Sequence, residues 1–203
     1  MDSAVATRCY ELWLDVGSAY SYIAWKSLPA FVARTGAAPE LRPMLLGGVF
    51  RATGNRSPVE VAAKARWAAD DLARWAARLS VPFSFNPWFP VNTIGPMRGA
   101  IALRLRAPHA LPHYLDAMFD AMWGSPCNLA DPQTLAAVAA RAGIDAAQFA
   151  AMIEDPQVKD ALRRDTEEAV ARGVFGAPTF FVGEAMFFGQ DRMEFVAEAL
   201  AAR

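Results

Sequence analysis

The hydrophobic pattern at the start of the chain predicts a strand, a helix and a second strand. Apolar and polar residues alternate over residues 9–15, as they do in a half-buried strand. Residues 19–35 carry apolar side chains at helical spacing, and Gly36 predicts the end of that helix. Residues 40–45 resemble a second strand, which the right-handed crossover rule makes parallel to the first.

The middle of the chain is predicted to be helical, with two loops. Residues 47–58 (GGVFRATGNRSP) are rich in Gly, Asn, Ser and Pro, which predicts a loop that closes over a site. Residues 86–96 (NPWFPVNTIGP) predict a second, proline-rich loop. Helical spacing predicts helices over 59–79, 97–105 and 113–123. Three more are predicted to begin at Asp131-Pro132, at Asp145 with Gln148, and at Asp155-Pro156.

Strand character returns near the C-terminus. Residues 179–182 (TFFV) and 185–188 (AMFF) are separated by Gly183-Glu184, a two-residue hairpin signal. Gly189-Gln190-Asp191 then opens the last helix, over residues 192–201. This order favours an α/β fold: a thioredoxin-like domain of residues 1–46 plus 173–203, interrupted by an all-helical insertion domain of residues 47–172.

Composition limits the partners that the protein can have. The 203 residues are 54% hydrophobic, with six Trp and thirteen Phe, which is enough for a large core. The net charge of −1 and the lack of a basic run argue against nucleic acid, and no apolar run is long enough to span a membrane. The first residues, MDSAVATRCYELW, lack the basic and apolar regions of a secretory signal, so we expect a cytoplasmic protein.

The cysteines and histidines predict neither a disulfide nor a metal site. Cys9 and Cys127 are far apart and outside any redox or metal-binding spacing, so we expect two free thiols in a reducing compartment. His109 and His113 lie in one segment that offers too few further ligands for zinc.

The four residues Ser18-Ala19-Tyr20-Ser21 lie where a predicted strand passes into a helix. The first backbone N–H groups of a helix lack intrahelical partners, and together with the peptide dipoles they favour an anion such as a thiolate. In thioredoxin-type redox proteins this corner carries a Cys-x-x-Cys pair. Here hydroxyls replace the sulfurs. Ser18 cannot exchange disulfides, but its O–H can donate a hydrogen bond to a thiolate that another molecule supplies.

Two segments near the C-terminus are further candidate sites. Pro178 stands at the first position of a strand, where it cannot donate to the ladder, and taken alone it would mark only an edge strand. Paired with Ser18, it favours a site in which Ala177 offers its backbone N–H and C=O to an extended peptide. Asp191 is a candidate helix cap, and with Gln190 a candidate partner for an ammonium group, while the helix N-terminus would bind a carboxylate.

Six segments, in chain order, resemble 2-hydroxychromene-2-carboxylate isomerases, which group with kappa-class glutathione transferases and the DsbA oxidoreductases. They are SAYSY at 18–22, TGN at 53–55 with Ser57-Pro58 and Lys64, DLARW at 71–75, FPVNT at 89–93, VFGAPT at 174–179 and FGQDR at 188–192. The resemblance covers nearly the whole chain and implies a thioredoxin-like domain with a helical insertion, bound glutathione and a homodimer. The chain departs from the family at Ala19, which replaces a proline, and at Gln190, which replaces an asparagine.

The resemblance also implies roles for individual residues. Ser18 would hold the glutathione thiolate, Ala177 and Pro178 would meet the tripeptide backbone, and the γ-glutamyl end would lie at Phe188, Gly189, Gln190 and Asp191. A small aromatic substrate would face Asn55, Pro58, Val59, Lys64 and Asn92. Its carboxylate would meet Lys64 or Arg98, each of which is equally well explained as a solvated helix charge.

The activity implied is a glutathione-dependent isomerisation of 2-hydroxychromene-2-carboxylate or a similar aromatic pyruvate-type compound. The thiolate adds, a double bond becomes a rotatable single bond, and elimination restores it. Two alternatives stay open. A kappa-type glutathione transferase would conjugate electrophiles at the same site, and a non-catalytic DsbA-like protein would only bind. The absence of a Cys-x-x-Cys pair argues against a disulfide oxidoreductase.

Overall fold

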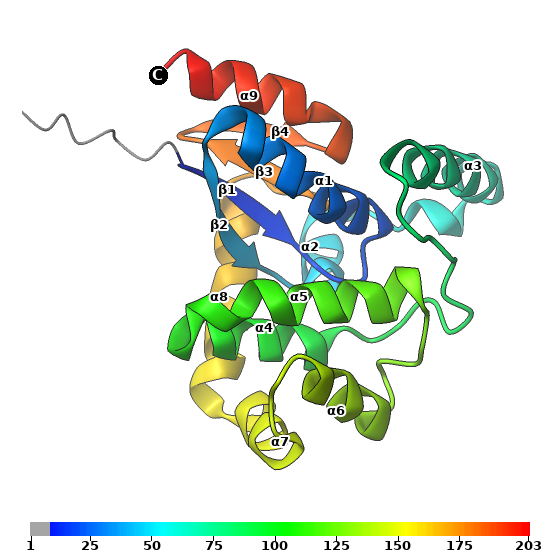
Figure 1. The fold of residues 1–203 in the computed structure, drawn as a ribbon, viewed down its shortest axis with the longest axis vertical. Helices are drawn as coiled ribbons and strands as arrows, with labels where there is room; N and C mark the ends of the chain where they lie inside the picture. The colour runs from blue at the N-terminus through cyan, green and yellow to red at the C-terminus, as the bar shows by residue number, and fades with distance from the viewer. Residues whose placement is uncertain (1–8) are drawn as a thin grey trace, which may run out of the picture.

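A four-stranded mixed sheet organises residues 9–203, the part of the chain that the computed structural model describes (Figure 1). The strands are β1 (Cys9–Leu14), β2 (Ala38–Pro43), β3 (Thr179–Val182) and β4 (Ala185–Phe188), in the order β2-β1-β3-β4. β2 is parallel to β1, whereas β3 is antiparallel to both β1 and β4. The predicted parallel βαβ unit and the C-terminal hairpin are therefore confirmed.

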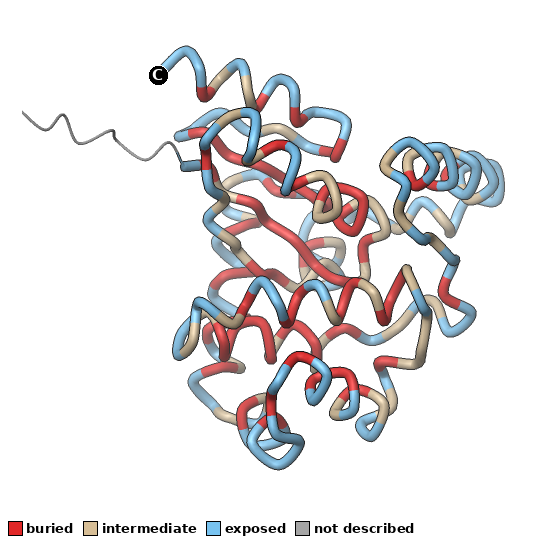
Figure 2. Tube along the Cα trace, in the orientation of Figure 1, coloured by how far each residue is buried: buried red, intermediate tan, exposed pale blue. Residues whose placement is uncertain are grey.

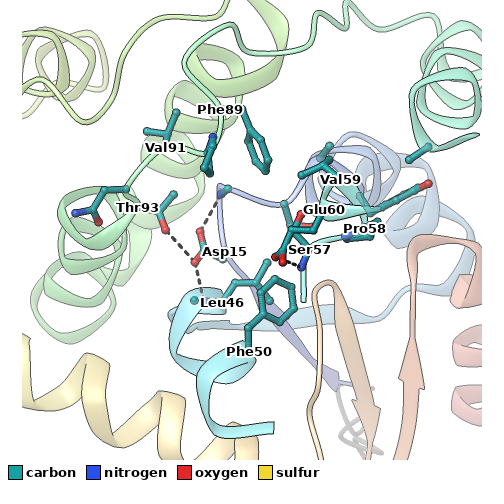
Figure 3. A pocket seen from close by; sticks show the side chains of 18 of the residues that line it. Asp15, Leu46, Phe50, Ser57, Pro58, Val59, Glu60, Phe89, Val91 and Thr93 are labelled. Atoms are coloured by element: carbon teal, nitrogen blue, oxygen red, sulfur yellow. Dashed lines mark hydrogen bonds between the residues drawn. The ribbon is translucent and has the colours of Figure 1, made fainter. Parts of the chain in front are cut away.

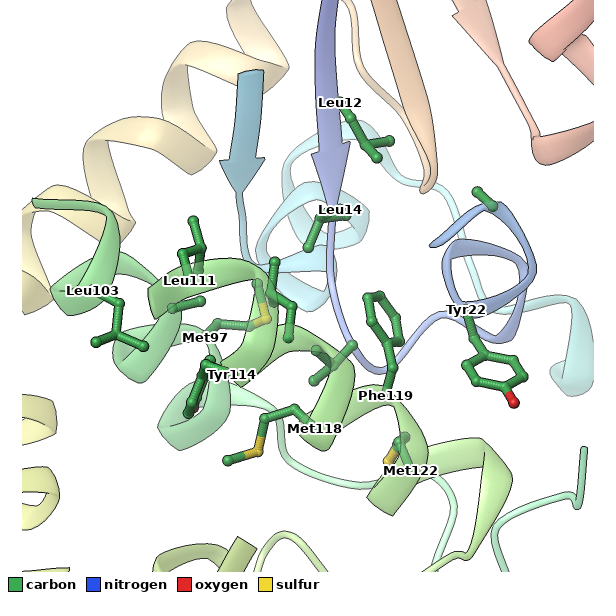
Figure 4. Close-up of a cluster of buried hydrophobic side chains, with 14 of the residues drawn as sticks. Leu12, Leu14, Tyr22, Met97, Leu103, Leu111, Tyr114, Met118, Phe119 and Met122 are labelled. Atoms are coloured by element: carbon green, nitrogen blue, oxygen red, sulfur yellow. The ribbon is translucent and has the colours of Figure 1, made fainter. Parts of the chain in front are cut away.

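The central strand β1 is buried on both faces (Figure 2). Leu12 and Leu14 face a large core that includes residues of α1 (Ala19–Thr35), α4 (Ile94–Arg106) and α5 (Leu111–Phe119), among them Phe119 and Met97 (Figure 4). Trp13, on the opposite face, packs in a smaller cluster with residues of α2 (Leu46–Thr53) and α8 (Pro156–Ala171). Because successive side chains of a strand point to opposite faces, this one segment joins both layers of helices and fixes where its C-terminal end emerges.

The helices of the described residues follow the predicted order closely. They are α1 (Ala19–Thr35), α2 (Leu46–Thr53), α3 (Ala62–Leu79), α4 (Ile94–Arg106), α5 (Leu111–Phe119), α6 (Pro132–Arg141), α7 (Ala146–Glu154), α8 (Pro156–Ala171) and α9 (Met193–Ala201). A short 3-10 turn, Pro58–Glu60, precedes α3, and a π-helical turn, Asp120–Gly124, extends α5. Gly36 ends α1 as predicted, with the positive φ of 67° that glycine adopts without strain.

The predicted N-terminal caps of three helices are confirmed. Asp131 accepts a hydrogen bond from the backbone N–H of Thr134, and Asp155 accepts one from Gln157. Asp145 accepts hydrogen bonds from two N–H groups of the first turn of α7. Each cap joins residues two or three positions apart, which is why the local sequence predicts it.

The prediction of a loop over residues 47–58 is wrong, because most of this segment forms α2. The N-terminus of α2 donates hydrogen bonds to side chains distant in sequence: Leu45 N–H donates to Thr166 Oγ1 at 3.0 Å and Leu46 N–H to Asp15 Oδ2 at 2.8 Å. Gly48 belongs in the helix because it packs against α8; a Cβ there would lie 2.9 Å from Thr166 Cγ2. Close packing therefore outweighs the low helix propensity of glycine.

Two element boundaries also shift. The helix predicted from residue 59 begins at Ala62, because Pro58–Glu60 forms the preceding 3-10 turn. The loop predicted to reach Pro96 ends earlier, since α4 begins at Ile94 and tolerates a proline in its first turn, where the missing N–H would have no partner.

The remaining expectations concern the N-terminus, the cysteines, metal ligands and membrane-spanning helices. Residues 1–8 lie outside the described part of the chain. They include the predicted start of the thioredoxin-like domain and most of the segment expected to lack a secretory signal. Within residues 9–203, Cys9 and Cys127 are both free thiols, and no group of three or more His, Cys, Asp or Glu side chains could hold a metal ion. In the same range no single helix is long and apolar enough to cross a membrane; α6 and α7 meet that criterion only jointly, across a bend of 116°.

Candidate active site

Ser18 is the N-cap of α1, at the point where β1 delivers the chain to the helix. Its Oγ accepts a hydrogen bond from the Ser21 N–H at 3.1 Å and donates one to the backbone carbonyl of Ala177 at 2.9 Å. The serine is 8% exposed. The first-turn N–H groups of Ala19 and Tyr20 precede the intrahelical hydrogen bonds, so this end of α1 favours an anion beside the Ser18 hydroxyl.

The Ala177-Pro178 peptide bond is cis, and it lies against Ser18 although 159 residues separate Ala177 from the serine. The loop around it is held on both sides. The Pro178 carbonyl accepts a hydrogen bond from the Gly189 N–H at 3.0 Å, and the Thr179 hydroxyl donates to the Gly176 carbonyl at 2.9 Å. Ser18 and the Ala177-Pro178 loop, which the sequence pairs as one candidate site, therefore lie together in one structural corner.

A cavity of about 520 Å³ opens beside Ser18 (Figure 3). Three segments form most of its wall: α2, the 3-10 turn Pro58–Glu60, and the loop that leads to α4. Apolar side chains dominate the lining, namely those of Leu46, Phe50, Pro58, Val59, Leu72, Phe85, Phe89, Val91 and Trp123. A space of this size and character suits a small aromatic molecule.

Asp15 is a fully buried carboxyl group in the wall of this cavity. Its Oδ1 accepts a hydrogen bond from the Gly17 N–H at 2.8 Å, and its Oδ2 accepts from the Leu46 N–H at 2.8 Å and from the Thr93 hydroxyl at 3.1 Å. Burial raises the pKa of Asp15 to about 6, although these three hydrogen bonds act to lower it. Asp15 thus joins the turn before Ser18, the start of α2 and the loop before α4; Figure 3 labels two of its partners, Leu46 and Thr93.

The cavity includes some of the residues predicted to face a substrate and not others. Pro58, Val59 and Asn92 line it together with Ser18. The Asn92 Oδ1 accepts a hydrogen bond from the Ile94 N–H at 3.0 Å, so this residue also supports the start of α4. Lys64 is exposed on α3 and does not line the cavity.

Asn55 and Arg98 also lie elsewhere. The Asn55 side-chain amide donates to the Phe175 carbonyl at 2.7 Å, which ties the segment after α2 to the loop that precedes Pro178. Arg98 is 3.5 Å from Glu154 and lines a different cavity, so the structure does not support Arg98 as a ligand of the substrate carboxylate.

The cation that the sequence analysis missed is Arg51, in the last turn of α2. Among residues 9–203 it is the only Lys, Arg or His that lines the cavity. It is exposed, and the described side chains offer it no ion pair. Leu46 and Phe50, four residues apart and followed by Arg51, have the spacing of one helix face, but the loop prediction for residues 47–58 concealed this pattern.

The segment predicted to hold a γ-glutamyl group lies next to the Ala177-Pro178 loop. Phe188 ends β4, and its ring packs on that of Phe175 with 4.6 Å between centroids. Gly189 has a φ of 106°, which only glycine adopts readily, and Gln190 is buried. These residues, like Ala177 and Pro178, lie outside the 520 Å³ cavity.

Asp191 is not a helix cap, contrary to that interpretation of the sequence. The residue at the N-cap of α9 is Arg192, without a side-chain hydrogen bond, and the Asp191 carboxylate instead accepts one from Arg192 Nη1 at 3.0 Å. The charge of Asp191 also reaches the start of α1. Burial raises the pKa of Tyr20, and the carboxylates of Asp71 and Asp191 add to that effect. The charge of Asp191 therefore acts on Tyr20, in the first turn of the helix that Ser18 caps.

Comparisons with known proteins find similar chains over nearly the whole length of this one. The family model described as DSBA-like thioredoxin domain matches residues 11–201. The chain is 31% identical to a 2-hydroxychromene-2-carboxylate isomerase from Sphingobium xenophagum, over 96% of this chain and 98% of the relative. It is 30% identical to glutathione S-transferase kappa 1 from Homo sapiens, over 97% and 92% of the two chains. A solved 2-hydroxychromene-2-carboxylate isomerase superposes with a TM-score of 0.82 at 26% identity, covering 96% of this chain and 95% of the other.

Proposed function

Because the chain belongs to the DSBA-like thioredoxin domain family, we propose that it is a glutathione-dependent isomerase acting on 2-hydroxychromene-2-carboxylate or a similar aromatic pyruvate-type compound. The observation that carries the proposal is the position of the Ser18 hydroxyl. It stands at the N-terminus of α1, touches the Ala177 carbonyl, and borders a mostly apolar cavity. The resemblance of the chain to isomerases and kappa-class transferases supports the same chemistry.

The residues at this corner fit glutathione. A thiolate would accept a hydrogen bond from the Ser18 hydroxyl, a peptide N–H would donate one to the Ala177 carbonyl, and an ammonium group would meet the Asp191 carboxylate. Bound glutathione would supply a thiolate that adds reversibly to a conjugated carbon, so that a double bond becomes a single bond, rotates, and is restored on elimination.

The energy required of Ser18 and α1 is modest. A thiol of ordinary acidity needs about 2 kcal/mol to ionise at pH 7. A hydrogen bond to a charged group contributes about 1.5–3 kcal/mol, and a helix N-terminus adds up to about 1 kcal/mol at a partly exposed position. The hydroxyl of Ser18 and the first turn of α1 would therefore be sufficient to keep a bound thiol ionised at pH 7.

Arg51 is the residue that we assign to the carboxylate of the substrate. The aromatic side chains of the cavity, Phe50 and Phe89 among them, would contact the ring of the substrate. Asn92 lies on the same wall, and its amide nitrogen is available to a carbonyl or hydroxyl group of the substrate while its oxygen supports α4. With one end of the substrate held by a cation and the other by apolar contacts, the bond between them is left free to rotate.

Conjugation without elimination is the second candidate, because a kappa-class transferase is among the relatives at 30% identity. The two activities differ in the fate of glutathione. An isomerase returns it unchanged, whereas a transferase consumes one molecule for each thioether formed.

The test is the conversion of 2-hydroxychromene-2-carboxylate with glutathione in less than stoichiometric amount. We expect many turnovers per glutathione. Ser18→Ala should lower kcat/KM by about 100-fold, since about 3 kcal/mol of thiolate stabilisation is lost. Arg51→Ala should raise KM about tenfold with little change in kcat, whereas Arg66→Ala, which removes an exposed cation outside the cavity, should change neither.

Two results would contradict the proposal. Stoichiometric loss of glutathione, with accumulation of a thioether, would establish the transferase instead. Failure of glutathione to bind in a calorimetric titration, with no thiolate absorbance near 240 nm, would remove the thiolate mechanism altogether. The proposed homodimer is tested separately, by sedimentation velocity.

A further inference from the structure

Residues of α2, α4 and α8, or next to them, line a second cavity of about 530 Å³. Leu45, Arg51 and Ile94 line both this groove and the cavity beside Ser18, so they form the wall between the two. Ser18 does not line the groove. Its volume lies in the range of small-molecule sites, and the proposed isomerisation makes no use of it.

The floor of the groove is apolar, with Leu45, Ile94, Leu162 and Val170 among its residues. Thr166 is the uncharged polar side chain of the lining, and its hydroxyl is already satisfied. It accepts from the Leu45 N–H at 3.0 Å and donates to the Leu162 carbonyl at 2.7 Å. A ligand would therefore find hydrophobic contact at the floor and no polar group there in need of a partner.

The rim of the groove is mainly basic. Arg51, Arg98, Lys159 and Arg163 line it, against the single carboxylate of Glu167. Arg163 is already paired with Glu167 at 3.0 Å. The excess of positive charge therefore lies with the other three cations.

Arg98 and Lys159 share one carboxylate. Both meet Glu154, at 3.5 Å and 2.6 Å respectively, and Glu154 lies outside the groove. Its side chain is 65% exposed. One exposed carboxylate cannot neutralise two cations, and exposed ion pairs contribute little to stability, so both cations can turn to a ligand at little cost.

We propose that this groove binds an organic anion that has one carboxylate and an apolar tail. The tail would lie on the floor between α2, α4 and α8, and the carboxylate would meet Arg98 and Lys159 at the rim. Because Arg51 also lines the Ser18 cavity, a ligand in the groove would touch the residue that we assign to the substrate carboxylate.

Calorimetric titration of the full chain with decanoate, without glutathione, tests this directly. We expect saturable binding of one decanoate per chain, and binding of butyrate, which has the same head group and a short tail, at least about tenfold weaker. Lys159→Glu should weaken decanoate binding about tenfold or more, because it places a like charge at the rim. Arg164→Glu, on α8 but outside the groove, is the matched control and should leave binding unchanged.

A second variant separates loss of binding from loss of fold. Ala171→Trp fills the groove from the end of α8, and should abolish decanoate binding while the unfolding transition stays cooperative. The proposal is overturned if decanoate gives no saturable heat, if Arg164→Glu weakens it as much as Lys159→Glu, or if it binds equally well to Ala171→Trp. It is also overturned if Lys159→Glu and Ala171→Trp change the sedimentation coefficient while decanoate fails to bind, since the groove would then be a contact between chains. None of these outcomes depends on isomerase activity.

Discussion

The titration of Asp15 offers the most direct test of the geometry beside Ser18. Burial raises the pKa of this carboxyl from 3.8 to about 6. A pKa that is higher in the folded state means that the folded protein binds the proton more tightly than the unfolded chain. The contribution of this group to stability is therefore fully present below about pH 4 and is lost as the pH rises through about 6, by about 3 kcal/mol in total.

Asp15→Asn isolates that contribution, because asparagine has nearly the same shape and does not titrate. The amide supplies one acceptor oxygen in place of two, and this loss is present at every pH. What the variant lacks, in addition, is the dependence of stability on pH that the titration of Asp15 causes. The unfolding free energy of the wild-type protein minus that of the variant should therefore fall by about 2 kcal/mol between pH 4.5 and pH 7.5.

Urea unfolding followed by tryptophan fluorescence, at both pH values, measures the difference. Asp70→Asn, which changes an exposed carboxylate on α3, is the control and should show the same difference at pH 4.5 and 7.5 within about 0.5 kcal/mol. A stability difference that grows toward pH 7.5 would refute the reasoning. It would mean that the hydrogen bonds from Gly17, Leu46 and Thr93 outweigh burial and that the carboxylate, not the acid, is the favoured form.

Two further predictions concern packing and unpaired polar groups. Ser21 Oγ is buried without a hydrogen-bond partner among the described residues, so Ser21→Ala should leave the unfolding free energy unchanged or raise it by up to about 1 kcal/mol; a loss above 1 kcal/mol in urea would indicate a partner. Gly48→Ala should lower it by about 1–3 kcal/mol, because the new Cβ would lie 2.9 Å from Thr166 Cγ2. Gly47→Ala, in the same helix with no atom within 4 Å, should instead be neutral or stabilising by up to about 1 kcal/mol, and equal effects at the two positions would disprove the α2–α8 contact.

The sequence predicted best the features that depend on neighbours along the chain. The caps at Asp131, Asp145 and Asp155 each bind backbone N–H groups two or three residues ahead, and the hairpin turn at Gly183-Glu184 joins adjacent strands. In such cases the whole interaction lies within a few residues, so the residue types alone indicate it.

Features that depend on distant partners were predicted less well. The helix α2 escaped prediction because its N-terminal N–H groups are bound by Asp15 and Thr166, and because Gly48 permits close contact with α8. The same error hid Arg51, so Lys64 and Arg98 were predicted as the cations that meet the substrate carboxylate. A cavity wall is set by which elements pack together, and residue type alone does not contain that information.

The hydrogen bond between Ser18 and Ala177 shows what the structure adds to two residues that the sequence had already indicated. A hydroxyl has a single proton, so Ser18 cannot donate to a thiolate while it donates to the Ala177 carbonyl at 2.9 Å. Rotation of the hydroxyl toward a thiolate leaves that carbonyl in need of a donor, and a peptide N–H of the same ligand would supply it. One internal hydrogen bond would be exchanged for two to the ligand, one of them to a charged acceptor. A ligand with both a thiolate and a correctly spaced peptide N–H is therefore favoured over a simple thiol, which would leave the Ala177 carbonyl buried without a donor.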